Sequence, residues 1–165
     1  MHTTIRHTLN TNPATFWELF FDEEFNREQF KRLKFDDWTQ LAFERKPDGS
    51  IVRKTRNSPP AKIPGPVQKA LGNVTSYIED GVYNPATGKF SFTAQAPGAD
   101  KVKTQGEVWV EPRGEAQVER IASIEISANV RFVGGMIESF IEQQTRRFYE
   151  KGAEFTNRWI ADKGL

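Results

Sequence analysis

The spacing of hydrophobic and polar residues changes along the chain, and each pattern predicts a different kind of element. Residues 2–9 (HTTIRHTL) carry alternating, often β-branched side chains, which is typical of a strand. The alternation is then lost, and two short helices are expected. Asn12 and Pro13 suit the start of the first, because Asn caps free backbone N–H groups and Pro fits the first helical position. Asp22 is expected to cap the second.

A period of two returns between Phe35 and Asn129 and predicts a series of antiparallel strands separated by turns rich in Pro, Gly, Asn and Asp. We expect these strands at residues 39–44, 51–57, 73–83, 89–96, 101–111 and 116–130. In the first of them, Leu41 and Phe43 should share a face. The segment SPPAKIPGP cannot join a ladder of backbone hydrogen bonds, so it predicts a connection, followed by one helical turn at Val67–Leu71.

Residues 136–162 contain no Pro and carry apolar side chains at helical spacing, so they predict one helix of about 40 Å at roughly 1.5 Å per residue. Gly134 and Gly135 permit a tight turn from the last strand into it. A meander of antiparallel strands has to bury one face, and this helix is the long element available to cover it. The pattern predicts an α+β fold: a curved antiparallel sheet of six to seven strands wraps around the C-terminal helix, with two short helices after the first strand.

Two stretches of the sequence resemble the START-like (helix-grip, SRPBCC) superfamily. The segment NPATFWELFFDEEFNREQF is similar to the strand–helix–helix entry of these proteins, and VRFVGGMIESFIEQQTRRFYEKGAEFTNRWI is similar to the C-terminal helix of uncharacterised bacterial members. The segment KTRNSPPAKIPGP resembles, more faintly, the sterol-transferring VASt domains. The resemblance implies a helix-grip fold and a single START-like domain over residues 1–165. Because the superfamily includes lipid-transfer domains, pollen-allergen-type carriers and polyketide cyclases, it also implies a hydrophobic small molecule or lipid as partner.

Composition and missing motifs argue against several classes of function. The 165 residues include 23 Lys and Arg against 22 Asp and Glu, a balance that argues against a dedicated nucleic-acid-binding protein. With no Cys and two His, we expect neither a disulfide framework nor a metal site. The sequence has no nucleophile elbow, H-E-x-x-H motif or P-loop, and we expect no cofactor. It shows no signal peptide and no apolar run of about 18 residues, which predicts a soluble, cytoplasmic protein.

The predicted inner face of the sheet and the covering helix supply the candidate ligand-binding residues. We expect them to line an apolar cavity, because apolar pockets in β-rich shells are common ligand sites. Gln144 would offer a polar group within an apolar stripe. The alternative is that the large aromatic side chains fill the space as ordinary core. The candidates are Phe90, Phe92, Val108, Arg120 and Ile124 on strands, and Met136, Phe140, Gln144 and Phe148 on the helix.

Arg120 is the most informative charged residue, because it is in phase with Val118 and Ala122 on the strand face expected to point inward. A buried guanidinium without a partner is costly. Arg120 therefore pairs with a carboxylate, meets the anion of a ligand, or lies at a strand end that is open to water. Arg53, in phase with Ile51, is a weaker case of the same kind.

Three other titratable residues, His7, Asp37 and Glu79, lie at or near strand positions. They could be arranged into an acid–base site, although nothing in their spacing requires it. A structural or exposed position is the alternative for each.

A run of basic residues brackets the Pro-rich connection. It could contact an anionic membrane surface transiently or gate the mouth of a cavity. The alternative is a solvated strand face beside a rigid loop. The run comprises Arg53, Lys54, Arg56, Lys62 and Lys69.

Three functions remain open. Binding or transport of a hydrophobic small molecule or lipid leads, because it needs a cavity and no catalytic groups. A polyketide cyclase- or aromatase-type enzyme would need two or more titratable groups that converge inside the cavity. A non-catalytic structural or regulatory module would have a filled core.

Overall fold

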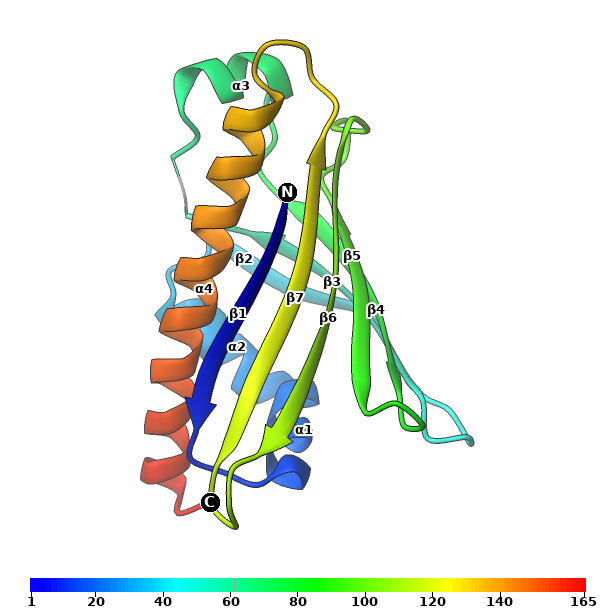
Figure 1. The fold of residues 1–165 in the computed structure, drawn as a ribbon, viewed down its shortest axis with the longest axis vertical. Helices are drawn as coiled ribbons and strands as arrows, with labels where there is room; N and C mark the ends of the chain where they lie inside the picture. Colours follow the sequence, from blue (N-terminus) through cyan, green and yellow to red (C-terminus); the bar gives the residue numbers. More distant parts are fainter. Residues whose placement is uncertain (61) are drawn as a thin grey trace.

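One antiparallel sheet of seven strands forms the frame of the protein, in a computed structural model that describes residues 1–60 and 62–165. The strands follow the spatial order β1-β7-β6-β5-β4-β3-β2, so β1 and β2 are the two edges. The sheet is strongly curved, and the helices lie on its concave side (Figure 1). The strands are β1 His2–Leu9, β2 Asp37–Arg45, β3 Ile51–Ser58, β4 Tyr77–Asn84, β5 Lys89–Gln95, β6 Val102–Pro112 and β7 Val118–Ala128.

The helices of the described residues are α1 Pro13–Phe21, α2 Glu23–Arg32, α3 Gly65–Leu71 and α4 Gly134–Lys163. Both predicted caps are confirmed, because Asn12 accepts a hydrogen bond from the backbone N–H of Thr15 and Asp22 accepts one from that of Phe25. The order of elements matches the prediction, and the α+β helix-grip architecture is confirmed. None of these helices has the length and apolar character needed to cross a membrane.

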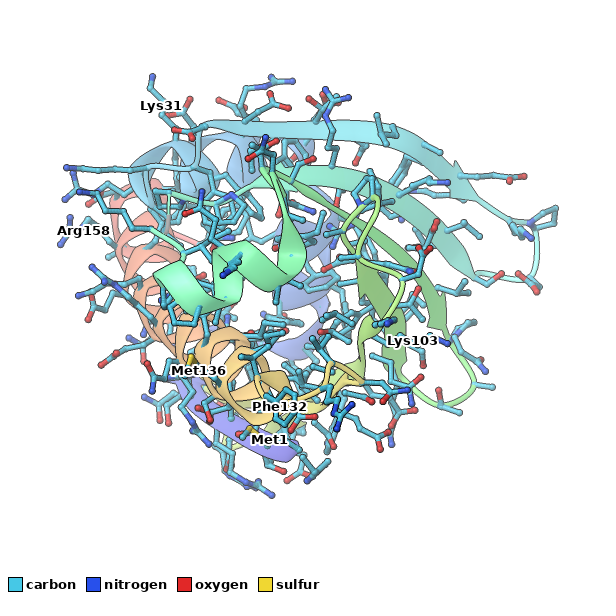
Figure 2. The ribbon with its side chains drawn as sticks, turned by 90° about the horizontal axis from the view of Figure 1, so that it is seen from above. Met1, Lys31, Lys103, Phe132, Met136 and Arg158 are labelled. Carbon is cyan, nitrogen blue, oxygen red and sulfur yellow. The ribbon has the colours of Figure 1, made fainter. Side chains whose placement is uncertain are left out.

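The long helix α4 runs beside β1 and β7 (Figure 1). Hydrogen bonds connect α4 to β1 and to the residue that follows β1. The Thr3 hydroxyl donates to Glu142 at 3.1 Å, and the Asn157 side chain accepts a hydrogen bond from the backbone N–H of Asn10 at 2.8 Å. Another side of α4 faces the concave side of the sheet. At one end of the molecule α3 lies between α4 and the strands farthest from α4 (Figure 2).

Aromatic residues of α1 and the middle strands form the main core. Phe90 on β5 is 1% exposed, and its ring centre lies 5.0 Å from that of Phe20 and 5.9 Å from that of Phe21. Both pairs are edge-to-face, an arrangement that aromatic rings favour. This core occupies the α1 end of the concave face.

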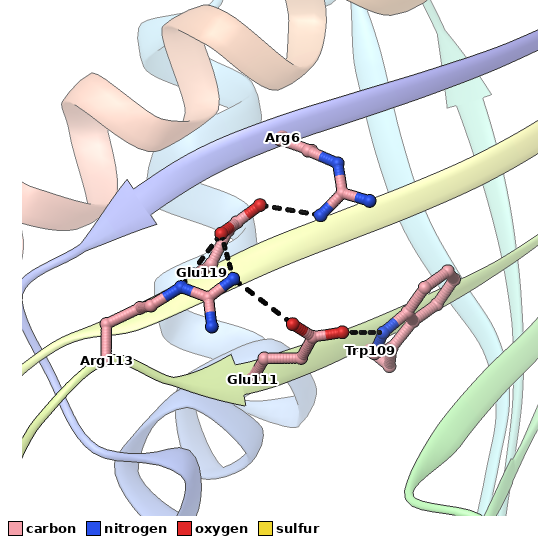
Figure 3. Close-up of polar contacts among 5 residues, drawn as sticks. All are labelled: Arg6, Trp109, Glu111, Arg113 and Glu119. Atoms are coloured by element: carbon pink, nitrogen blue, oxygen red, sulfur yellow. Dashed lines mark hydrogen bonds and ion pairs between the residues drawn. The ribbon is translucent and has the colours of Figure 1, made fainter.

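The outer face of the sheet is polar, which is why the strands show a period of two. Glu119 accepts hydrogen bonds from Arg6 at 2.7 Å and from Arg113 at 3.0 Å, and Arg113 also donates to Glu111 (Figure 3). These arginines hold the pKa of the Glu119 carboxyl below its ordinary value. Because the pairs are exposed to water, they contribute little to stability. Their role is to keep this face solvated while the opposite face carries the core.

Several strands begin or end one to four residues from the predicted bounds, and one strand contains a bulge. Strand β4 begins at Tyr77 rather than at residue 73. The pairing of β2 with β3 contains a bulge at Leu41, and the extra residue reverses the alternation from there on. As a result Leu41 is 44% exposed while Phe43 packs against the core, so the prediction that they share a face is wrong.

Candidate ligand-binding site

A cavity of about 1100 Å³, the large cavity, lies on the concave side of the sheet between α4, strands β4 to β7 and the segment around α3. Ile63 and Leu71 contribute from the α3 side. Pro64 directly precedes α3 and Pro66 lies in its first turn, so fixed backbone angles help to hold this helix in place. The apolar side chains on the sheet and α4 include Phe92, Ala94, Val102, Ile124, Phe140 and Ile141.

A second space of about 80 Å³, the small chamber, lies deeper, toward α1 and α2. It adjoins the large cavity, because Glu79, Phe92, Phe148 and Tyr149 line both. It is far smaller than the large cavity, and its size suits a few waters or one small polar group. Its wall mixes aromatic rings with polar side chains, and the latter include Asn26, Gln29, Arg53, Thr55, Asn57, Arg120 and Thr156.

Arg53 on β3 borders the small chamber and is 6% exposed. Its guanidinium donates to the Phe20 carbonyl at 2.6 Å and forms an ion pair with Glu79 at 3.5 Å. Burial lowers the pKa of Arg53, and Glu79 opposes that change. Burial raises the pKa of the Glu79 carboxyl, and Arg53 opposes that in turn. The two charges of this pair therefore compensate each other.

Arg120 on β7 is 8% exposed and has no carboxylate partner among the described residues. Its Nη2 atom donates to the Tyr149 carbonyl at 2.7 Å and lies 3.3 Å from His7 Nδ1. The guanidinium carbon is also 4.8 Å from the centre of the Tyr149 ring. Burial lowers the pKa of Arg120 to about 10, so it remains charged at neutral pH. Burial first, and Arg120 second, lower the pKa of His7 from its ordinary 6.5.

The mouth of the large cavity is basic. Six basic and three acidic residues line this cavity, and all six basic ones are exposed. Lys151 forms an ion pair with Glu154 at 3.2 Å, whereas the other five have no such partner in the described part of the chain. The whole chain has a net charge of only +1, so positive charge is concentrated here. The basic residues are Arg32, Lys34, Lys62, Arg147, Lys151 and Arg158.

The structure brings eight of the nine candidate residues to these two spaces. Met136 lies outside both: it is in the first turn of α4, before Phe140, and 48% exposed (Figure 2). Ile124, Phe140 and Gln144 line the large cavity, Phe90, Val108 and Arg120 line the small chamber, and Phe92 and Phe148 line both.

Sequence reasoning missed most of the polar wall of the small chamber. On β3, Arg53, Thr55 and Asn57 are all buried and in phase with Ile51, so the inward face of this strand is polar along most of its length. Polar residues at alternate strand positions, in phase with an apolar residue, indicate a polar inner face. Each of these buried polar side chains then requires a hydrogen-bond partner. Gln29 and Tyr149, which reach the chamber from α2 and α4, left no such signal.

The three residues considered for an acid–base site are not brought together. Asp37 is exposed and pairs with Arg56 at 3.3 Å, whereas Glu79 pairs with Arg53 and His7 lies against Arg120. The strands that carry His7 and Asp37 are the opposite edges of the sheet.

The basic run around the Pro-rich connection divides between different environments. Arg53 is buried, while Lys54 and Arg56 pair with acidic residues on the outer face. Lys62 lies at the mouth of the large cavity. Contact of these residues with a membrane surface stays a prediction.

Sequence comparison identifies one matching family. A family model described as protein of unknown function (DUF2505) matches residues 4–160, nearly the whole chain. No curated protein matches the chain in sequence.

Solved structures share the fold over the full length. Zhui aromatase/cyclase from Streptomyces sp. R1128 has a TM-score of 0.69 at 12% identity, covering 100% of this chain and 96% of that one. A START superfamily protein from Mycobacterium smegmatis has a TM-score of 0.60 at 14% identity, with 98% and 97% covered. Norcoclaurine synthase from Thalictrum flavum, in complex with dopamine and hydroxybenzaldehyde, has a TM-score of 0.66 at 13% identity, with 98% and 88% covered. At these identities the likeness establishes a START-like fold. The fainter VASt similarity stays a prediction.

Proposed function

The chain belongs to the DUF2505 family, and we propose that this member binds or transports a hydrophobic small molecule or lipid in the large cavity. The observation that carries the proposal is the space of about 1100 Å³ between α4 and the sheet. It is comparable to the upper end of the range of about 300–1000 Å³ that small-molecule sites occupy. A core filled by its own aromatic side chains would not leave such a space.

An apolar ligand suits the wall of this cavity. Ile124 from the sheet and Phe140 from α4 line it from different elements, and Val102 and Ile141 extend the apolar surface. Removing apolar ligand surface from water stabilises a complex by about 25 cal/mol per Å² before the costs of association are subtracted. Gln144 and Thr145 supply polar groups among these side chains.

A second candidate function is catalysis of the cyclase or aromatase type. The observation in its favour is that titratable groups from several strands and α4, namely Arg53, Glu79, Arg120 and Tyr149, converge at the small chamber. Convergent titratable groups in a pocket are what such chemistry needs. The solved structure of Zhui, an aromatase/cyclase, has the same fold.

Titration with Nile red, a neutral dye that fluoresces in apolar surroundings, tests the binding proposal. The wild-type protein should bind the dye. Phe140→Trp should weaken binding severalfold, because the larger ring extends into the cavity that Phe140 lines. Phe132→Trp is the matched control. Phe132 is 90% exposed and outside both spaces, so this variant should bind Nile red with wild-type affinity.

Absence of dye binding by the folded wild-type protein would contradict the proposal. Native mass spectrometry of the protein purified from its own host separates the two candidate functions. A carrier should retain a co-purifying small molecule unchanged. An enzyme should convert the molecule that it retains when the two are incubated, and Glu79→Gln should stop that conversion.

A further inference from the structure

We propose that the ligand of this site is an amphipathic carboxylic acid, with its carboxylate bound by Arg120 in the small chamber and its apolar part in the large cavity. This inference rests on the proposed function, because it names the class of ligand for the same cavity.

Arg120 lacks the compensation that a buried charge requires. The sequence left three states open for it: a carboxylate partner, a ligand anion, or a strand end open to water. No described carboxylate pairs with it, and at 8% exposure it is not open to solvent. An unpaired buried charge costs several kcal/mol in principle. The Tyr149 carbonyl and ring are neutral partners and leave the charge itself unbalanced. An anion supplied by a bound molecule would balance it.

Two donor atoms of Arg120 have no partner among the described residues. Both of its hydrogen-bond contacts use Nη2, which leaves Nε and Nη1 without partners among the described residues. Among the described residues, Arg53 Nε is the one side-chain nitrogen or oxygen that is both fully enclosed and without a partner. Nε and Nη1 of Arg120 are therefore not fully enclosed. Arg120 itself lines the small chamber, so a molecule in that space can approach its side chain. The N–H groups of Nε and Nη1 do not lie parallel, so each can donate a single charge-assisted hydrogen bond to a carboxylate oxygen.

The other charges of the chamber do not compete for this role. Arg53 is already compensated by Glu79, so Arg120 carries the uncompensated charge of the chamber. The volume of about 80 Å³ suits a single small head group. Phe148 and Tyr149 line both spaces, so a molecule that reaches past them would have its head at Arg120 and its tail in the large cavity.

The charge at the entrance is suited to the same class of ligand. The basic residues of the mouth outnumber the acidic residues of the cavity six to three. A positive rim raises the local concentration of anions and speeds their entry. A carrier of neutral lipids would gain nothing from this arrangement.

Isothermal titration calorimetry with decanoate and decan-1-ol at neutral pH tests the proposal, because the two probes share a chain length and differ in charge. Wild-type protein should bind decanoate about 10- to 100-fold more tightly, the range expected for a hydrogen-bonded charged group. Arg120→Met should abolish that preference and leave decan-1-ol affinity within about twofold. Arg120→Lys retains the charge on a compact ammonium with fewer donors and a different reach, and should give an intermediate preference.

Arg113→Met, which removes an arginine from the outer face, is the matched control and should leave both affinities unchanged. Equal wild-type affinity for the two probes would overturn the carboxylate assignment while leaving the proposed function standing. An equal loss for both probes in folded Arg120→Met would overturn the role of Arg120. Failure of the wild type to bind either probe or Nile red would overturn the proposed function itself. If Arg120→Met does not fold, the wild-type preference and its reduction in Arg120→Lys decide the matter.

Discussion

The ring of Phe90 lies against the backbone of Gly81 on the neighbouring strand, in space that a side chain would otherwise occupy. A Cβ atom at position 81 would lie 2.6 Å from Cε2 and 2.7 Å from Cε1 of that ring. The guanidinium carbon of Arg53 lies 5.2 Å from the centre of the same ring. The missing side chain at Gly81 therefore sets the position of Phe90, and Phe90 in turn bounds the small chamber beside Arg53.

Gly81→Ala should lower the free energy of unfolding by about 1–3 kcal/mol, the usual cost of forcing extra volume into a packed core. The added methyl group has to displace the Phe90 ring, which is 1% exposed and packed against α1. Urea unfolding followed by circular dichroism measures the change.

Gly135→Ala is the matched control for that substitution. A Cβ at Gly135 meets no atom within 4 Å, and the residue lies in the first turn of α4. Because Ala favours helix over Gly by up to about 1 kcal/mol, this variant should be as stable as the wild type or slightly more stable. Equal stability of Gly81→Ala and the wild type would show that Phe90 can move away without cost.

The parts of the fold that depend on neighbouring residues could be predicted from the sequence. Asn12 and Asp22 each cap a helix through a backbone N–H three residues further on, so the signal and the structure are local. The bulge at Leu41 could not be predicted, because it depends on how β2 pairs with β3 across a turn. The positions after it reverse their faces, and no local pattern records that reversal.

For the site, the inward phase of a strand was predictable but the space that each residue reaches was not. Phe90 and Ile124 were placed on one inner wall, yet the first lines the small chamber and the second the large cavity. Phe148 and Tyr149 on α4 lie at the boundary of the two spaces, where Phe148 packs against Phe30 and Phe35 and Tyr149 against the main core. This packing depends on contacts between residues far apart in the sequence.

Stability should depend on pH through His7. Its pKa is lowered from 6.5 in the folded protein, chiefly by burial. Between the lowered value and 6.5 the unfolded chain binds more protons than the folded one, so the free energy of unfolding should fall as pH falls through this window. His7→Gln should flatten that dependence, measured by urea unfolding between about pH 5 and pH 8.

The other histidine of the chain provides the control for this effect. His2 is exposed and contacts Ser123 on the outer face, so His2→Gln should keep the wild-type dependence on pH. An unchanged slope in His7→Gln would rule out His7 as its source.

The connection between β7 and α4 carries backbone strain at Phe132. This residue has a φ of 68° and is 90% exposed, so its ring contributes little packing while its backbone is left-handed. The left-handed region costs an L-residue about 1–2 kcal/mol, and Gly escapes that cost but loses more freedom on folding. Phe132→Gly should thus be more stable than Phe132→Ala by up to about 1 kcal/mol in urea unfolding. Greater stability of the Ala variant would contradict the strain.

Truncation after Gly135 should abolish cooperative folding. The shortened chain loses nearly all of α4, whose Ile137, Ala153 and Ile160 are buried. Apolar surface returned to water costs about 25 cal/mol per Å², and the whole fold has a net stability of only about 5–15 kcal/mol. Urea titration followed by circular dichroism should show no sigmoidal transition.

Removal of Gly164 and Leu165 alone is the control: Leu165 is 58% exposed, so that variant should unfold cooperatively near the wild-type midpoint. A cooperative transition in the chain that ends at Gly135 would mean that the sheet is stable without its covering helix.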